Sequence, residues 1–187
     1  HCSNHSGMGG SIVGIHTDET KADQYASNCT FAVPLVGANS DVSASIACTT
    51  TNKSVTSNGT AAASNIQSNF YNGSFLFDGN SDYLSIPDNA DFELGSDDFT
   101  LEAYVYQNND AGTGGSSHTI FGKWNNTGNQ KSYALRISSN SGQKLQFFWS
   151  TDGSTNSSLQ SSGSLSSNRW YHVAVVNDGG TITLYID

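Results

Sequence analysis

The clearest structural pattern in the chain lies in residues Ser74–Val105, which read SFLFDGNSDYLSIPDNADFELGSDDFTLEAYV. In its last part, Phe99–Val105, apolar and polar side chains alternate. This period of two predicts a β-strand with one face on a core and the other facing outward. Earlier apolar side chains in the stretch are expected to join the same core, and these are Phe75, Phe77, Tyr83 and Ile86.

Short alternating runs separated by turn residues continue on both sides of this stretch. Downstream, we expect strands over 118–124, 132–138, 145–150, 157–161, 169–176 and 181–186. The last two are joined by Asn177-Asp178-Gly179-Gly180, which is a strong hairpin signal. Upstream, we expect strands around 12–16, over 30–37 and 42–49, and near 53–56. About ten to twelve strands without a helix of note predict an all-β sandwich or jelly roll of two antiparallel sheets.

Composition narrows the classes of partner. The 187 residues carry a formal net charge of −9, which argues against nucleic acid and against an anionic membrane surface. No apolar run approaches the length of a membrane span, so we expect no membrane insertion. Residues 1–28 are rich in Gly and Ser and are interpreted as an arm or the tail of a preceding domain, with the sandwich over 29–187. Histidines 1, 5 and 16 fit no metal motif and are interpreted as loop residues.

The three cysteines are Cys2, Cys29 and Cys48. Cys29 begins one expected strand region and Cys48 nearly ends the next, so a disulfide between them is one hypothesis, with Cys2 left over. The alternative is that all three are free thiols. A disulfide would place the protein outside a reducing cytosol.

Several motifs in this order resemble the laminin-G-like branch of the concanavalin-A-like lectin/glucanase fold. They are FLFDGNSDYLSIP, DFELGSDDFTLEAYVY, TIFGKW, SYALRI, LQFFWS and RWYHVAVVNDGGTITLYID, within residues 72–187. The resemblance implies a concanavalin-A-like jelly-roll sandwich. Because the family usually continues with two or three more strands, this chain is expected to lack the last C-terminal strands. Either the chain is a processed or fragmentary piece, or another segment completes the sheets.

An upstream segment carries a second resemblance. FAVPLVGAN, followed by TSNGTAAASNIQSNFYNGSFLFDG, is similar to the start of laminin-G-like domains in virion proteins of marine tailed phages. This resemblance extends to about Cys29 and implies a virion structural protein.

The same fold includes glycoside hydrolases, so an enzyme must be considered. Hydrolysis of a glycosidic bond needs two carboxylates on either side of that bond. Glu102 lies on a suitable strand, but its neighbours on that face are Thr100 and Tyr104. The alternative is that Glu102 is a surface residue paired with Arg136 or with a hydroxyl. We therefore expect no catalytic residues.

Calcium is the cofactor that the residues suggest. Asp78, Asn80 and Asp82 offer hard oxygen ligands within one turn, and related domains often bind calcium at the rim of the sandwich. The alternative is a hairpin turn in which Asp78 and Asn80 cap backbone N–H groups.

A glycan-binding surface would use exposed aromatic side chains, and no single one can be chosen from the sequence. The candidates are Tyr104, Tyr106, Trp124, Trp149 and Tyr171, whereas Trp170 is expected to be structural.

The sequence therefore predicts a non-enzymatic module at an extracellular or virion surface. Its expected partners are other copies or other structural proteins of the same assembly, or host-surface glycans. The alternatives are a secreted cellular adhesin, a carbohydrate-binding module attached to an enzyme, and a glycoside hydrolase.

Overall fold

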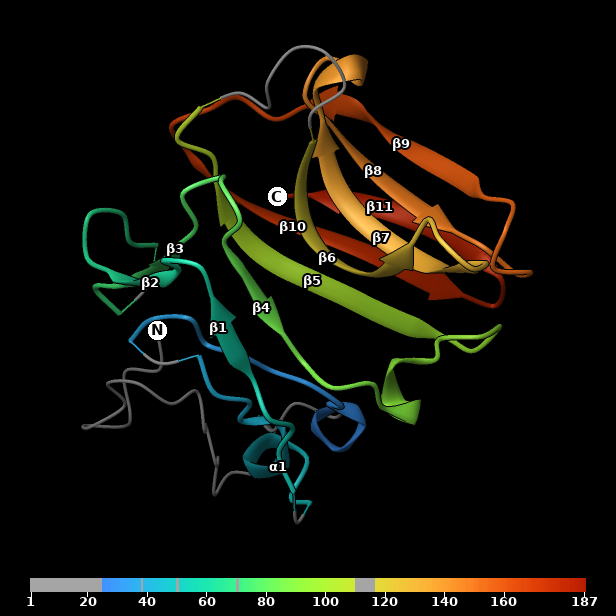
Figure 1. Ribbon diagram of the computed structural model, residues 1–187, viewed down its shortest axis with the longest axis horizontal. Coiled ribbons are helices and arrows are strands. Elements are labelled where there is room, and N and C mark those ends of the chain that lie inside the picture. The colour runs from blue at the N-terminus through green and yellow to red at the C-terminus, as the bar shows by residue number, and fades with distance from the viewer. Residues whose placement is uncertain (1–24, 38, 50, 70, 110–116) are drawn as a thin grey trace. The chain divides into compact units, whose positions relative to one another are not determined.

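The computed structural model describes residues 25–37, 39–49, 51–69, 71–109 and 117–187 (Figure 1). The chain divides into two compact units, His1–Asp88 and Asn89–Asp187, and each is described here by itself. This division lies further along the chain than the expected boundary after Asn28, which stays a prediction. The strand expected around 12–16, Cys2 and the three N-terminal histidines lie outside the described residues.

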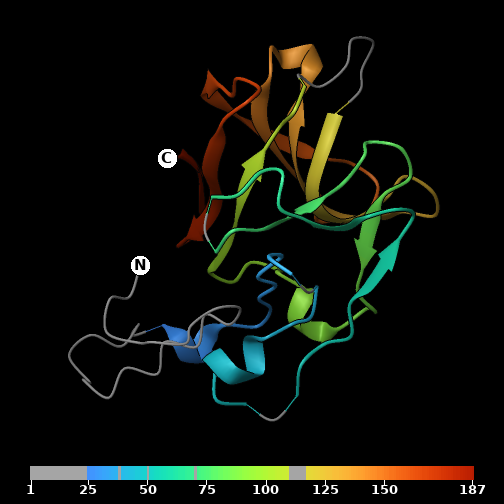
Figure 2. The ribbon, with the colours of Figure 1, turned by 90° about the vertical axis from the view of Figure 1, so that its left-hand side faces the viewer.

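The second unit holds two antiparallel sheets. The three-stranded sheet has the order β11-β10-β5, formed by β5 (Phe99–Tyr106), β10 (Trp170–Asp178) and β11 (Thr181–Ile186). The four-stranded sheet has the order β6-β7-β8-β9, formed by β6 (Ser117–Asn125), β7 (Gln130–Ser138), β8 (Lys144–Trp149) and β9 (Ser157–Ser164). Figure 2 shows the strands of the two sheets as separate layers of this unit. Two short 3₁₀ helices, η2 (Ala90–Phe92) and η3 (Ser139–Ser141), lie in its connections.

Alternating side chains from both sheets fill one core between these layers. Val173 and Val175 of β10 are fully buried, as are Leu135 of β7 and Leu145 of β8. The ring centroids of Phe99 in β5 and Phe147 in β8 lie 6.1 Å apart, so this aromatic contact joins the two sheets. Burying each large apolar side chain contributes about 1.5–3 kcal/mol. The predicted sandwich of two antiparallel sheets is therefore confirmed.

The hairpin between β10 and β11 forms where the sequence places it. Asp178 pairs with Thr181, which leaves Gly179 and Gly180 as a two-residue loop. Both glycines have positive φ, at 55° and 84°, which is the conformation that a type I′ turn requires. The amide of Gly179 also donates to Oδ1 of Asp98, at 2.8 Å.

The first unit contains short elements only. They are η1 (Ala26–Asn28), α1 (Ser43–Ile46), β1 (Thr56–Asn58), β2 (Ala62–Ser64), β3 (Ser74–Leu76) and β4 (Tyr83–Ser85). β1 pairs with β4, and β2 pairs with β3, both antiparallel. None of the described helices is both long and apolar enough to cross a membrane.

Two of the expected strands in the first unit are wrong. Residues 30–37 form no strand, because Pro34 has no N–H to donate and Leu35 has a φ of 53°. Residues 42–49 contain the helix α1 in place of a strand. Their alternation uses mainly Ala and Ser, which bury little apolar surface, so a local hydrogen-bond network decides the conformation.

That network centres on Asp41, which is 2% exposed. Its Oδ1 accepts from the amides of Ala32 and Ser43, at 3.1 and 2.9 Å. Its Oδ2 accepts from the amide of Lys53 at 2.7 Å and from the Ser43 hydroxyl at 3.0 Å. Burial alone would raise the pKa of the Asp41 carboxyl, but these hydrogen bonds outweigh burial and lower its pKa below the usual value.

The structure corrects the hypothesis of a disulfide between Cys29 and Cys48, because no bond joins these two residues. Cys29 follows the 3₁₀ helix η1, and Cys48 lies just beyond α1 with a φ of 54°. Neither cysteine is on a strand, so the neighbouring strands that were to bring them together do not form. Cys48 is exposed.

We expect Asp41→Asn to destabilise the first unit. The amide nitrogen of Asn would meet the N–H of Lys53 where a carboxylate oxygen now accepts, and loss of such a buried acceptor costs about 1–3 kcal/mol. Amide hydrogen exchange of the full chain would measure this, as faster exchange at Ala32, Ser43 and Lys53. The matched control is Ser40→Ala, because Ser40 is exposed.

The pH dependence follows from the lowered pKa of Asp41. A depressed folded-state pKa stabilises the protein above the unfolded pKa, and this contribution is lost as pH falls through the folded-state value. Protection at these amides should therefore fall below about pH 4 in the wild type. Equal acid sensitivity in the wild type and Asp41→Asn would contradict this role.

Candidate functional site

The outer face of the three-stranded sheet carries aromatic and ionisable side chains. Val173 and Ala103 pair and point into the core, so their neighbours along each strand point outward. His172 pairs with Tyr104 across the strands, and their ring centroids lie 4.8 Å apart. Tyr185 of β11 is 52% exposed, and it lies across from Ala174 on the same face.

Glu102 lies on this face with a histidine beside it. Its Oε2 is 2.9 Å from Nε2 of His172, and the Glu102 side chain is 61% exposed. The predicted alternative of an Arg136 partner is wrong, because Arg136 belongs to the other sheet. On this face of β5, the neighbours of Glu102 are Thr100 and Tyr104.

The outer face of the four-stranded sheet forms a second candidate surface. Leu135 and Phe147 pair and point into the core, so Arg136, Gln146 and Phe148 point outward. The Arg136 guanidinium lies 4.3 Å from the centroid of the Phe148 ring. Its Nε and Nη2 donate to Oε1 of Gln146, at 3.4 Å each. The amide of Gln146 in turn donates to the Ser141 hydroxyl at 2.9 Å.

Trp124 extends this second surface onto β6. Its ring packs edge-on against Phe148, with centroids 6.2 Å apart, and the Lys131 Nζ lies 5.9 Å from the Trp124 centroid. Gly122 lies across from Ala134, and a Cβ on Gly122 would approach the Ala134 Cβ to 3.1 Å. Small residues at these two positions keep the two backbones close between the larger rings.

The five candidate aromatics divide between surface and core. Tyr104 is 50% exposed and Trp124 is half-buried on an outer face, whereas Tyr171 is buried and Trp149 packs against the core and stacks on Phe147. Tyr106 lies against Trp170, with ring centroids 5.5 Å apart. The sequence alone could not assign these roles, because each depends on the phase of its strand.

Comparison with known proteins places this geometry in a family. The model of the concanavalin A-like lectin/glucanases superfamily matches residues 78–187. The chain belongs to this superfamily. The match covers both outer faces of the lectin-like sandwich and the turn before β4. No curated protein and no solved structure matches the chain significantly.

The turn before β4 holds the residues of the predicted calcium site, and hydrogen bonds within the chain occupy its carboxylates. Oδ1 of Asp82 accepts from the amide of Thr60 at 2.5 Å, and Oδ2 accepts from the amide of Asp78 at 2.9 Å. Oδ1 of Asp78 accepts from the amide of Asn80 at 2.7 Å, and Oδ2 accepts from the Thr60 hydroxyl at 3.3 Å. Gly59 has a φ of 73°, and a Cβ there would collide with the Asp82 carboxylate.

These contacts match the alternative in which the acidic residues close a hairpin turn. Hydrogen bonds from the amides of Asp78 and Thr60 lower the pKa of the Asp82 carboxyl. An ion would have to compete with those hydrogen bonds for the same oxygens. Among the described residues, no group of three or more His, Cys, Asp or Glu side chains could hold a metal. The arrangement therefore does not favour calcium binding by Asp78, Asn80 and Asp82, which the sequence suggested and which the variants described below test.

Sequence reasoning missed His172, Gln146 and Phe148 as residues on the outer sides of the two sheets. The phase of the alternation in β10 and β8 contains part of the signal, because His172 lies between two buried residues and Phe148 follows the buried Phe147. The pairing of His172 with Glu102 spans seventy positions, so it requires the register between β5 and β10.

A pair of variants separates the two interpretations of the Asp78–Asp82 turn. Asp82→Asn removes an acceptor for backbone amides, so we expect the amide NMR signals of Thr60 and Asp78 to shift even in EDTA. Asn80→Ala should leave the turn unchanged, because the hydrogen bond in this turn uses the Asn80 backbone amide. Calcium should produce no saturable shift in the wild type. A saturable calcium shift that Asn80→Ala abolishes would contradict this expectation and establish the ion site.

Proposed function

We propose that the sandwich is a non-enzymatic carbohydrate-binding module that acts at an extracellular or virion surface. Membership of the lectin/glucanase superfamily supports carbohydrate binding or adhesion in general. The observation that carries the proposal is the cluster of Tyr104, His172 and Glu102 on the outer face of the three-stranded sheet.

This cluster has the chemistry that sugar recognition uses. Tyr104 presents an exposed apolar ring that can stack on the C–H face of a sugar, and its hydroxyl can bond to sugar hydroxyls. Glu102 accepts and His172 can donate or accept hydrogen bonds beside the ring. Pairing of Glu102 with an imidazole, in place of a second carboxylate, supports binding without glycoside hydrolysis.

The second part of the proposal concerns whether the module belongs to a virion or to a cellular secreted protein. The resemblance of the segment from Cys29 to FLFDG to phage virion domains supports a virion structural protein. Such a module would serve in assembly with other copies or structural proteins, or in attachment to host-surface glycans. The alternative proposal is a secreted cellular adhesin or a carbohydrate-binding module attached to an enzyme. A catalytic domain encoded beside this segment would favour the alternative.

A glycan array probed with the full chain tests carbohydrate binding. We expect Tyr104→Ala to weaken binding to the retained glycans at least tenfold, because the stacking surface is lost. Tyr83→Ala is the matched control, since Tyr83 is an equally exposed tyrosine in the first unit. Binding that Tyr83→Ala reduces as much as Tyr104→Ala would place the glycan elsewhere.

The same glycans also test the non-enzymatic part of the proposal. After prolonged incubation with the wild-type chain, we expect no new reducing ends. Release of reducing ends that Glu102→Gln abolishes would identify a glycosidase. An array on which no glycan is retained would leave assembly as the remaining function.

A further inference from the structure

Positive charge is concentrated in one part of this acidic chain. Residues 117–169, which contain the whole four-stranded sheet, hold five of the seven Lys and Arg residues and one of the sixteen Asp and Glu residues. Strands β6 to β9 themselves contain no Asp or Glu. The rest of the chain holds two basic and fifteen acidic residues, so the sheet is a positive region on a negative protein.

The one acidic residue in this region is engaged in hydrogen bonds, and two of the basic residues have a carboxylate partner. Lys131 donates to a backbone carbonyl, that of Ser154, at 2.6 Å. Asp152 caps its own turn, where its carboxylate accepts from the amides of Ser154 and Thr155, both at 2.8 Å. Lys123 lies 3.7 Å from Glu93, and Arg169 forms an ion pair with Asp187 at 2.6 Å.

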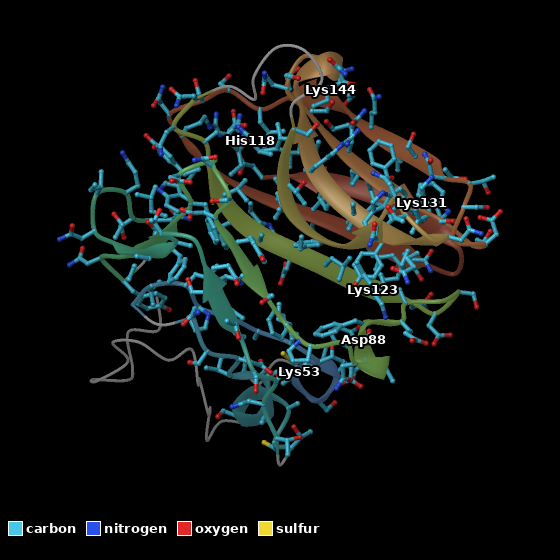
Figure 3. All side chains as sticks on the ribbon, in the orientation of Figure 1. Lys53, Asp88, His118, Lys123, Lys131 and Lys144 are labelled. Atoms are coloured by element: carbon cyan, nitrogen blue, oxygen red, sulfur yellow. The ribbon has the colours of Figure 1, made fainter. Side chains whose placement is uncertain are left out.

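The other three cations are Lys131, Arg136 and Lys144, and they form a row along the direction of β7. Lys131 lies near the start of the strand, Arg136 lies five residues further on, and Lys144 of β8 pairs with Ser138. At about 3.3 Å per residue, this row is about 23 Å long. Figure 3 shows Lys131 and Lys144 at opposite ends of the sheet. No carboxylate among the described residues forms an ion pair with these three side chains.

Arg136 is the central member of the row and is held in place. It stacks on Phe148 and bonds to Gln146, which is 5% exposed and is itself held by Ser141. Its partners are an aromatic ring and a neutral amide, so the guanidinium keeps an uncompensated charge at the surface. A fixed guanidinium on a ring offers a planar donor set that suits carboxylates and sulfate-like anions.

We propose that the outer face of the four-stranded sheet binds an anionic polysaccharide, with Arg136 as the central contact and Lys131 and Lys144 on either side. This inference rests on the proposed carbohydrate-binding function and adds to it a second face, on the four-stranded sheet, with its own ligand class. Trp124 and Phe148 supply rings for stacking on sugars, and the exposed Ser158 and Gln160 of β9 face the same side. The shared ligand chemistry is a chain of sugars with carboxylate or sulfate groups.

The spacing of the cations favours a glycan over a nucleic acid. Lys131 and Arg136 lie about 17 Å apart along the strand, whereas phosphates follow each other about every 3.4 Å along a duplex strand. Cations this far apart do not follow a phosphate backbone, and the rings of Trp124 and Phe148 beside them fit the faces of sugars. The acidic remainder of the chain would also repel a densely charged phosphate backbone.

Titration calorimetry of the full chain tests the proposal with four polymers: alginate, dextran sulfate, neutral dextran and poly(dT). We expect alginate, dextran sulfate or both to bind in 50 mM salt, and the one that binds identifies the anionic group. We expect Arg136→Gln to weaken that binding at least tenfold. Arg169→Gln is the matched control, because it removes the same charge from an arginine that Asp187 already pairs, and it should change binding less than twofold.

A second variant keeps the proposal testable if Arg136→Gln fails to fold. Ser158 is exposed and lies across from Phe148, so Ser158→Glu places an acid on the binding face without disturbing the core. It should also weaken binding at least tenfold while the thermal unfolding temperature stays at the wild-type value.

The remaining outcomes overturn the inference in distinguishable ways. Equal losses in Arg136→Gln and Arg169→Gln would mean diffuse charge attraction without a site. Tight poly(dT) binding that depends on Arg136 would identify a nucleic-acid surface. Failure of both anionic polymers, with Tyr104-dependent binding to the glycan array intact, would overturn this inference and leave the proposed function standing. Failure of every glycan in both experiments would overturn both.

Discussion

The contact between Phe99 and Phe147 shows the constraint on which the rest of the sandwich depends. The two rings come from different sheets and meet in the core, beside the fully buried Val173 and Leu135. Once these side chains point inward, the alternation of each strand sends the next residue outward. The inner packing therefore decides which residues each outer face presents, and a shift of one residue in register would exchange the two sets.

The two outer faces that result differ in chemistry. The three-stranded sheet presents Tyr104 and the Glu102–His172 pair, while the four-stranded sheet presents Arg136 on Phe148 and contains no acidic residue. One core thus supports an aromatic, mildly acidic surface and a basic one. In a chain with a net charge of −9, this separation gives an anionic ligand a single favourable face.

The strands of the second unit could be predicted because their signal is geometric. Alternation over Phe99–Val105 and the Asp178-Gly179-Gly180 turn each specify one local conformation, and the structure follows both. Residues 42–49 show where prediction from alternation fails. There the buried Asp41 carboxylate bonds to backbone amides up to twelve positions away, and these bonds override a weak pattern of small residues. The surface clusters could not be predicted, because they require the register between strands that are distant in sequence.

The central claim is that the outer faces of the sandwich recognise a glycan and leave it intact. Amide NMR spectra of the labelled full chain, recorded repeatedly over a long incubation with a bound polysaccharide, test it most directly. We expect shifts to cluster at outward-facing residues of one sheet, either Tyr104 and His172 or Arg136 and Phe148, and to stay constant with time. Shifts centred on Glu102 that decay as the polysaccharide is cleaved would contradict it.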